Sequence, residues 1–326
     1  MGAVLTVVLG LSGALVYGFA DFLGGLASRR VRPVRVAAVA ALVGLVPLLV
    51  GFAVLGGRFS EQAVVAGVVA GLSGAVGVLL LYAALAIGPM SVLSPLTAVF
   101  SAVVPVVVAL VRGTVLSPLG VVALVVAVVA VVLVAAVPDP GGARLTLRGV
   151  VTAAVAGCGF GGVVLGYDAS PPDSGVATLL VARTLQVVLL GAAALVTLRL
   201  GGRVGTRPGG TPAATTTPDV RPVAGRVQPG RVRPGWVRPG WVRPARALVL
   251  VVIGCGVFDA MANVFIQAGL HSSDDPSTLP VISVLNALYP IGTVVLAGIV
   301  LRERLTALQA TGIVLAFAAS VGLAVS

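Results

Sequence analysis

Long, almost uninterrupted apolar runs dominate the pattern along the chain, and short polar segments separate them. There are ten such runs, and they lie at residues 3–27, 33–55, 63–87, 91–111, 118–137, 147–167, 175–198, 247–270, 278–301 and 306–325. Each has about 20 to 25 residues, which as a helix rising about 1.5 Å per residue crosses the roughly 30 Å hydrocarbon layer of a membrane. The pattern predicts an all-α integral membrane protein with ten transmembrane helices.

Helices are expected although the runs are rich in valine, which favours strands in water. In lipid each backbone N–H and C=O must find its partner within the protein, and runs of this length do so as helices. A membrane barrel would show alternating segments of about ten residues, and the sequence has none. Composition agrees, since 58% of the residues are hydrophobic and 10% charged. Soluble enzymes, nucleic-acid binders and disordered proteins are thereby excluded.

The two halves of the chain resemble each other. Residues 93–105 and 278–290 each carry two prolines ten positions apart, and 117–135 aligns without gaps to 306–324. We therefore expect two five-helix repeats, at 1–137 and 147–325. Because five is odd, the second repeat enters the membrane upside down relative to the first, and inverted repeats place a site near the midplane between them.

Prolines inside the repeats have two possible roles. The four are Pro95, Pro105, Pro280 and Pro290. Each can open the helical hydrogen-bond ladder and free carbonyls toward a cavity, or produce a kink without function.

A polar segment at 199–246 interrupts the second repeat. It is rich in Arg, Gly, Pro and Thr, and it contains the near-repeat VRPGWVRPGWVRPAR. This composition is typical of a disordered, partly extended linker. Its tryptophans, Trp236 and Trp241, are expected near the membrane interface. The alternative is a tolerated insertion without function.

Charge predicts the orientation in the membrane. The net charge is +11, and all 21 basic residues are arginine. We call the side that holds the N-terminus and the even-numbered connectors face A, and the opposite side face B. Face A has only Arg58 and Arg112, whereas most other arginines fall on face B. The positive-inside rule then places face B in the cytoplasm and both termini outside.

Several segments resemble the EamA family of the drug/metabolite transporter superfamily. They are YGFADFLGGLASRR at 17–30, GPMSVLSPL at 88–96, the YP pair at 289–290 and LRERLTALQATGIVLAFAASVGLA at 301–324. The resemblance implies ten helices in two inverted EamA repeats that export or exchange small metabolites. It covers nearly the whole chain except 199–246, and many members are described with cytoplasmic termini, contrary to the charge argument.

The first repeat departs from the family pattern. It reads VRGTVLSPLG where the second has the ERLTALQ element, and it lacks the pair formed by Glu303 and Arg304. It also has 12 residues from Pro105 to Ser117, against 16 from Pro290 to Thr306. The helix at 91–111 is therefore expected to be short or remodelled at its end.

Three ionisable residues lie clearly within the apolar runs: Asp21, Arg183 and Asp259. Each costs about 2.5–3.5 kcal/mol at the centre of a membrane helix. Asn263 and Gln267 follow Asp259 at intervals of four and complete a polar stripe on one helix face. Apolar surroundings favour the neutral form of a carboxyl group, so Asp21 or Asp259 could carry a coupling proton.

Other polar residues complete the candidate site. Tyr17 lies one turn before Asp21, and Ser283, Asn286 and Tyr289 lie in the ninth run beside Pro290. We expect a polar cavity lined by the first, seventh, eighth and ninth helices. Within it Arg183 would neutralise Asp259 or bind a substrate carboxylate or phosphate. The structural alternative is that these groups only hold helices together.

Further residues are expected to be structural. Gly67, Gly71 and Gly74 form a small helix face for close packing. His271, the only histidine, is expected to be a solvated loop residue rather than a pH sensor, and Glu303 part of an interfacial ion cluster. Cys158 and Cys255 lie in separate apolar runs without metal-ligand or redox spacing.

The sequence predicts a secondary transporter of a small metabolite or drug-like solute by alternating access. The alternatives are a non-transporting scaffold or sensor of the same fold and a lipid-linked intermediate flippase. We expect no enzymatic activity, cofactor, metal or nucleic-acid partner, because there is no nucleophile–base constellation or phosphate loop. The expected partners are membrane lipids and possible coupling protons, in a monomer or homodimer of the bacterial plasma membrane. No cleavable signal peptide is expected.

Overall fold

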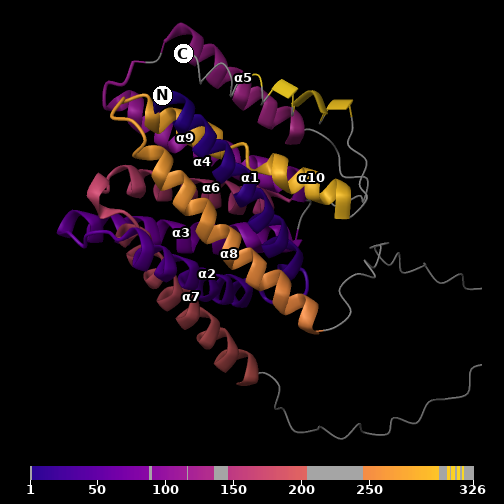
Figure 1. Cartoon of the computed structure of the whole chain (residues 1–326). Coiled ribbons are helices and arrows are strands. Elements are labelled where there is room, and N and C mark those ends of the chain that lie inside the picture. The colour runs from indigo at the N-terminus through magenta and orange to yellow at the C-terminus, as the bar shows by residue number, and fades with distance from the viewer. Residues whose placement is uncertain are drawn as a thin grey trace, which may run out of the picture.

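A computed structural model describes residues 2–87, 90–115, 117–135, 146–203 and 245–300, together with 307, 308, 310–312, 314, 315 and 318. Its main elements are α1 (Gly2–Ser28), α2 (Pro33–Leu55), α3 (Glu61–Ile87), α4 (Met90–Val111), α5 (Pro118–Ala135), α6 (Leu147–Asp168), α7 (Ala177–Arg203), α8 (Ala245–Leu270), α9 (Thr278–Asn286) and α10 (Pro290–Val300). The helices lie side by side in one bundle (Figure 1). The predicted all-α architecture is confirmed over the described residues, and the first eight apolar runs match single helices.

Six of these helices are long and apolar enough to cross a membrane: α1, α2, α3, α6, α7 and α8. The apolar parts of α4, α5 and the α9–α10 region are shorter. The tenth predicted run lies largely outside the described residues, as do Glu303 and residues 204–244 of the predicted linker. Residues 199–203, assigned to that linker from the sequence, instead continue α7. The chain is thus a multi-pass membrane protein, in which six spans satisfy the length criterion.

Local sequence explains where several helices begin. The hydroxyl oxygens of Ser60, Ser117 and Thr146 accept hydrogen bonds from backbone N–H groups three residues later, at 3.1, 2.9 and 3.1 Å. These bonds satisfy donors that the first turn leaves without a partner. At the other end of α4, Gly113 adopts a φ of 90°, so the helix ends six residues after Pro105. The helix has 22 residues, so it is not short, and a remodelled end stays a prediction.

The ninth predicted run is not one helix. It is divided into α9 and α10 by a turn at residues 287–289, which corrects the predicted single helix at 278–301. Pro290 has no N–H to donate and disfavours helical geometry at the residue before it. The N–H groups of Leu288 and Tyr289 bond instead to carbonyls three residues back, at 3.1 and 3.0 Å. Pro95 and Pro105 lie inside the continuous helix α4, so they do not break it.

Corresponding helices of the two halves run in opposite directions. α1 is antiparallel to α8, α3 to α6, and α2 to α7, whereas α3 and α7 are parallel. Two contacts set the direction of each pair. They are Gly13–Ile266 and Leu23–Gly254 for α1 and α8, and Gly166–Ala70 and Gly159–Gly77 for α6 and α3. They are Gly51–Val176 and Gly44–Arg183 for α2 and α7, and Gly67–Thr178 and Gly74–Gln186 for α3 and α7. α6, α7 and α8 therefore point opposite to α1, α2 and α3, which is the arrangement expected of inverted repeats.

Small residues allow these helices to approach closely. Gly67 and Gly71 of α3 pack against Val181 and Ala182 of α7, which confirms the predicted small packing face. The outer faces carry large apolar side chains. On α2, Leu42, Val46 and Leu49 are about half exposed or more, at the spacing of one helix face. Such a surface suits lipid, and polar groups are left to the interior.

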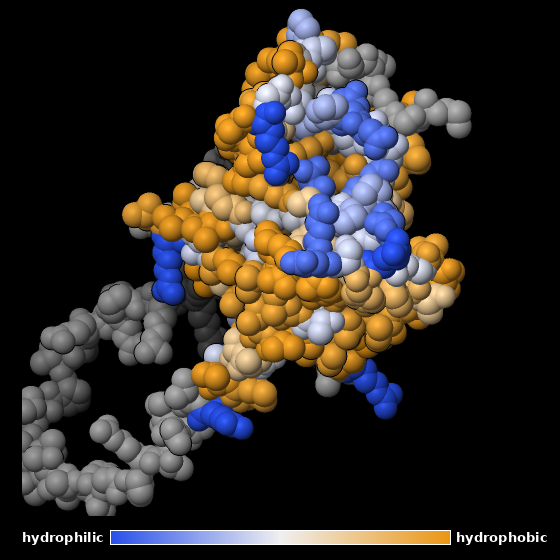
Figure 2. All heavy atoms as spheres, turned by 90° about the vertical axis from the view of Figure 1, so that its left-hand side faces the viewer, coloured by the Kyte–Doolittle hydropathy of each residue, from blue (hydrophilic) through white to orange (hydrophobic). Residues whose placement is uncertain are grey.

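Connectors predicted to share face A do lie together. Arg58 pairs with Asp173 at 3.4 Å and Arg112 with Asp168 at 3.0 Å. Figure 2 views the bundle from the left of Figure 1 and shows hydrophilic residues gathered on this face, with hydrophobic residues around them. On face B, Arg32 donates to the Thr197 carbonyl at 3.2 Å.

Candidate functional site

An ion pair between two helices is the centre of the buried polar groups. Arg183 of α7 pairs through Nη2 with Asp259 of α8, and their side chains are 7% and 15% exposed. Asp259 lies at the middle of the span Arg246–Leu270. The two residues form the ion pair that one of the two predicted roles of Arg183 requires. A pair this well shielded needs further hydrogen bonds to offset the loss of water around both charges.

Neighbouring side chains supply those hydrogen bonds. The Nη1 of Arg183 donates to Gln186 Oε1 at 3.1 Å. Asn263 Nδ2 donates to the backbone oxygen of Asp259 at 2.7 Å, and the Tyr167 hydroxyl donates to Asn263 Oδ1 at 2.8 Å. One connected network thus joins α6, α7 and α8.

The ion pair borders a small pocket, which we call the ion-pair pocket. Its walls include small residues of α2 and α3, and its polar and aromatic lining residues are Tyr17, Tyr82, Phe160, Arg183, Gln186, Asp259 and Asn263. The pocket has room for about one or two water molecules. No metabolite fits there unless the helices move apart.

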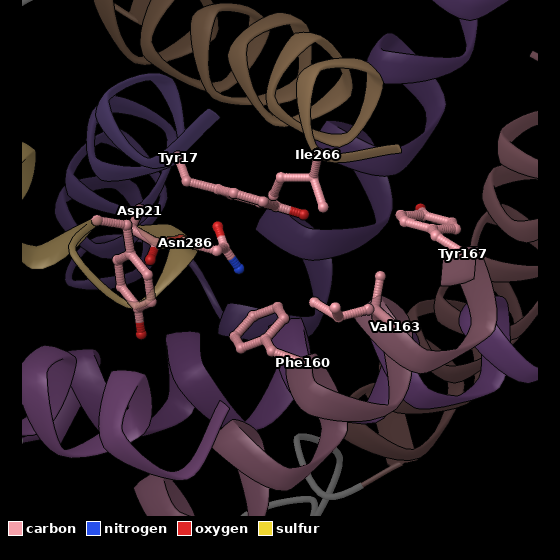
Figure 3. Close-up of a pocket in the computed structure, with 9 residues that line it drawn as sticks. Tyr17, Asp21, Phe160, Val163, Tyr167, Ile266 and Asn286 are labelled. Carbon is pink, nitrogen blue, oxygen red and sulfur yellow. The ribbon is translucent and has the colours of Figure 1, made fainter. Parts of the chain in front are cut away.

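A second pocket, which we call the Asp21 pocket, shares Tyr17, Phe160 and Val163 with the first. Its lining residues are Tyr17, Asp21, Phe160, Val163, Val164, Tyr167, Ile266, Asn286 and Tyr289. Figure 3 shows Asp21 and Asn286 close together at one end and Tyr167 at the other, with Phe160 and Val163 between them on the α6 side. It has room for about one water molecule.

Asp21 differs from Asp259 in its surroundings. It is 5% exposed, and within the described part of the chain no side chain donates a hydrogen bond to its carboxylate and no cation pairs with it. The Oδ1 of Asn286 is also buried without a partner among the described residues. Two hydrogen-bond acceptors therefore face the same pocket unsatisfied.

The α9–α10 turn fixes one wall of the Asp21 pocket. The Tyr289 hydroxyl donates to the Ser94 carbonyl of α4 at 3.1 Å, and Thr293 Oγ1 donates to the Gly18 carbonyl at 3.1 Å. A Cβ at Gly18 would overlap the Tyr289 carbonyl oxygen and lie 2.7 Å from the Gly292 Cα. Only glycine lets α1 approach the turn this closely.

Most of the predicted site residues line these two pockets. Gln267 is the exception, because it donates to Ser170 Oγ at 3.3 Å near face A and lines neither pocket. Ser283 is also outside, and its hydroxyl bonds back to the Leu279 carbonyl at 2.6 Å. Of the polar stripe on α8, only Asp259 and Asn263 therefore belong to the site.

The predicted set of lining helices was incomplete. α6 contributes Phe160 and Tyr167, α3 contributes Tyr82, and α2 closes the ion-pair pocket. Tyr167 and Tyr82 had a usable signal, because a tyrosine inside an apolar run usually seeks a hydrogen-bond partner. Gln186 had another, since it follows Arg183 by three residues on the same helix face. Phe160 had none.

His271, just beyond α8, is not the freely solvated residue expected. Its ring is partly buried, and Nε2 is shielded without a hydrogen-bond partner among the described residues. This burial lowers the pKa of His271 below its ordinary value, although backbone hydrogen bonding with Ser170 and the charge of Asp168 oppose the shift. The ring is therefore packed as a neutral group at face A.

The arrangement defines a class: a multi-pass membrane protein with ionisable groups enclosed between helices of opposite direction. Comparison with family models agrees. The chain belongs to the EamA-like transporter family, whose model matches residues 4–136 and 232–325, and the resemblance seen in the sequence is confirmed. Membership suggests a transporter of the drug/metabolite type, acting on a small molecule among membrane lipids, and the family consists of transporters rather than enzymes.

Solved structures support the fold alone. One solved structure, described as "Crystal structure of protein", has a TM-score of 0.64 with 15% sequence identity, covering 97% of this chain and 95% of that chain. Comparison with curated protein sequences finds no match.

Proposed function

We propose that the protein is a secondary transporter that moves a small, partly polar solute by exposing the buried site alternately to face A and face B. The observation that carries this proposal is the enclosure of charged and polar groups between oppositely directed halves, in pockets too small for a solute. A site of this kind is reached only when the halves separate, and their inverted relation provides two equivalent ways to do so.

The two halves are proposed to be 1–137 and 147–325. Separation toward face A would release the contacts of Arg58 with Asp173 and of Arg112 with Asp168 at the end of α6. Separation toward face B would release the contact of Arg32 with α7. These weak, exposed contacts cost little to break. The network of Arg183 and Asp259 would hold the centre while either end opens.

Orientation follows from the described charges. Both arginines of face A pair with aspartates there, whereas the described part of face B has Arg29, Arg30, Arg32, Arg35, Arg148, Arg199, Arg203 and Arg246 and no acidic residue. The positive-inside rule supports a cytoplasmic face B and an external N-terminus in a bacterial plasma membrane. A reporter fused at Ser326 tests this, and cytoplasmic activity of the reporter contradicts it. Export or exchange is the proposed direction.

The experiment is a flux screen with the full chain in proteoliposomes, over amino acids, nucleosides, sugars and organic cations. We expect protein-dependent flux of one class, lowered about tenfold or more by Asp259→Asn and by Arg183→Gln. Asp274→Asn, which removes an exposed carboxylate in the loop after α8 at face A, should leave flux unchanged. Flux that survives both central substitutions unaltered contradicts the assignment of the site.

A variant that lacks residues 204–244 distinguishes a transporter from a non-transporting scaffold of the same fold. The ends of α7 and α8 stay intact in this variant. A transporter should retain its flux without the segment, and complete loss in a folded variant would contradict the proposal.

A further inference from the structure

Arginines from both halves of the chain lie near one another at face B. α2 begins at this face, and the antiparallel α7 ends there. Arg32, just before α2, donates through Nη1 to the Thr197 carbonyl of α7 at 3.2 Å. Arg35 lies in the first turn of α2, and Arg199 lies two residues beyond Thr197. The contact therefore places positive charges of opposite halves at the same end of the α2–α7 pair.

The start of α8 adds another positive charge. α8 runs parallel to α2, because Gly256 packs against Ala40 and Gly44 packs against Ala260. Both helices begin at face B, so Arg246, the second residue of α8, lies near the start of α2. α2 packs against both α7 and α8, and the three helices lie side by side in Figure 1. We call Arg32, Arg35, Arg199 and Arg246 the face B arginine cluster.

The face B arginine cluster has no counter-charge among the described residues. The described part of face B contains no acidic residue, and no carboxylate there pairs with any of the four guanidinium groups. The Nε of Arg35 is shielded from solvent and has no acceptor within the described part of the chain. Gathered like charges repel, and a shielded donor without an acceptor costs free energy. An anion at this position offsets both costs.

Apolar side chains continue from the cluster toward the membrane interior. On α7, Leu195, Val196 and Leu198 precede Arg199, and on α8, Val249 and Leu250 follow Arg246. All five side chains are about half exposed or more. Surfaces of this kind suit acyl chains, and arginine keeps its charged end at the level of the lipid headgroups. A ligand that uses both surfaces carries an anionic head and an apolar tail.

We propose that the face B arginine cluster binds the headgroup of an anionic phospholipid at the junction of α2 with α7 and α8. Guanidinium groups present several N–H donors in a planar arrangement that matches phosphate oxygens. The phosphate accepts hydrogen bonds from arginines of both halves, and the acyl chains lie along the exposed apolar faces of α7 and α8. The bound lipid therefore stabilises the arrangement in which the two halves meet at face B.

The test is calorimetric titration of the purified full chain in detergent with a short-chain phosphatidylglycerol. Phosphatidylcholine with the same acyl chains and inorganic phosphate are the matched probes. We expect saturable binding of phosphatidylglycerol that weakens between about 0.05 M and about 0.5 M salt, together with a rise in melting temperature. Equal binding of phosphatidylcholine overturns the proposal. Binding of inorganic phosphate as tight as that of the lipid overturns it in favour of a site for a free anion.

Variants locate the lipid. Arg35→Gln and Arg199→Gln each remove one positive charge from a different half, and each should weaken binding about fivefold. The double variant should weaken it about tenfold or more and abolish the rise in melting temperature. Arg148→Gln is the matched control, because this exposed arginine of face B lies on α6, which packs mainly against α3 and α4. An equal loss of binding in Arg148→Gln shows a diffuse charge effect and overturns the site.

The segment 204–244 needs its own control, because it is also rich in arginine. The variant that lacks these residues retains the face B arginine cluster and should bind phosphatidylglycerol as tightly as the full chain. Loss of binding in this variant, with its melting temperature unchanged in the absence of lipid, overturns the proposal. Lipid binding is expected whether or not the chain transports a solute, so the result is independent of the flux screen.

Discussion

Two aspartates at membrane depth have opposite surroundings. Asp259 faces the guanidinium of Arg183, and the network around the pair reaches Gln186, Asn263 and Tyr167. Asp21 has no such partners in the described part of the chain and faces a pocket instead. A satisfied network fixes the helices that carry it, whereas an unsatisfied acid is free to exchange protons or cations. In the proposed transporter Asp259 would hold the helices together, and Asp21 would be the residue available for proton exchange.

Breaking the ion pair should have the largest effect. Arg183→Gln leaves Asp259 buried without its cation, and loss of one partner of a buried pair typically costs about 3–5 kcal/mol. We expect a large fall in the melting temperature in detergent. The double variant Arg183→Gln with Asp259→Asn should be more stable than the Arg183→Gln variant, because it leaves no uncompensated charge. Equal stability of the single variant and wild type would contradict the assigned holding role.

The wall of the Asp21 pocket is tested by Gly18→Ala. The added methyl meets the Tyr289 carbonyl and Gly292, and overpacking of this kind costs about 1–3 kcal/mol. Gly191→Ala is the matched control, because a Cβ there meets no described atom within 4 Å and alanine favours the helix by about 0.5–1 kcal/mol. A Gly18→Ala variant as stable as Gly191→Ala would show that α1 does not pack this closely on the turn.

Protonation of His271 at face A is expected to lower the stability of the protein in acid, independently of Asp21. The pKa of His271 is lowered by burial, so the folded protein binds fewer protons there than the unfolded chain. The stabilisation by neutral His271 is present above the ordinary pKa of about 6.5 and is lost as the pH falls through the lower folded value. Between about pH 7.5 and pH 5, we expect the melting temperature of the His271→Asn variant to fall less than that of wild type. An unchanged pH profile would contradict this account.

Asp21→Asn should change stability least. The substitution removes an ionisable group that has no partner to lose, so we expect a melting temperature at neutral pH equal to or slightly above that of wild type, within about 0.5 kcal/mol. The same measurement on Asp259→Asn should show a clear decrease. If both variants lose stability equally, the contrast between the two aspartates is wrong.

Sequence reasoning recovered the helices well because lipid imposes a simple length rule on apolar runs. It missed the turn between α9 and α10, since Pro280, Pro95 and Pro290 look alike in sequence. Of these three prolines, only Pro290 follows a turn that interrupts the helical hydrogen bonds. Pro280 lies in the first turn of α9, where its missing N–H costs nothing.

The candidate site was only partly predictable for a related reason. Polar residues stand out in an apolar run, so Asp21, Arg183 and Asp259 were found. Phe160 was not, because both the lipid-facing and the inward-facing sides of these helices are apolar and the pattern does not distinguish them. The pairing of Arg183 with Asp259 left Asp21 alone, and that outcome depends on how α7 and α8 both pack against α2.

The confinement of the ion pair to one half has an energetic consequence. Two identical, oppositely directed halves would give conformations of equal free energy with either end closed. α2 and α3 correspond to α7 and α8 in the other half. Their only charged residues are Arg35 and Glu61 near their starts, so they have no counterparts of Arg183 and Asp259. In the proposed transporter this asymmetry removes the degeneracy, so the two end-closed conformations would differ in free energy.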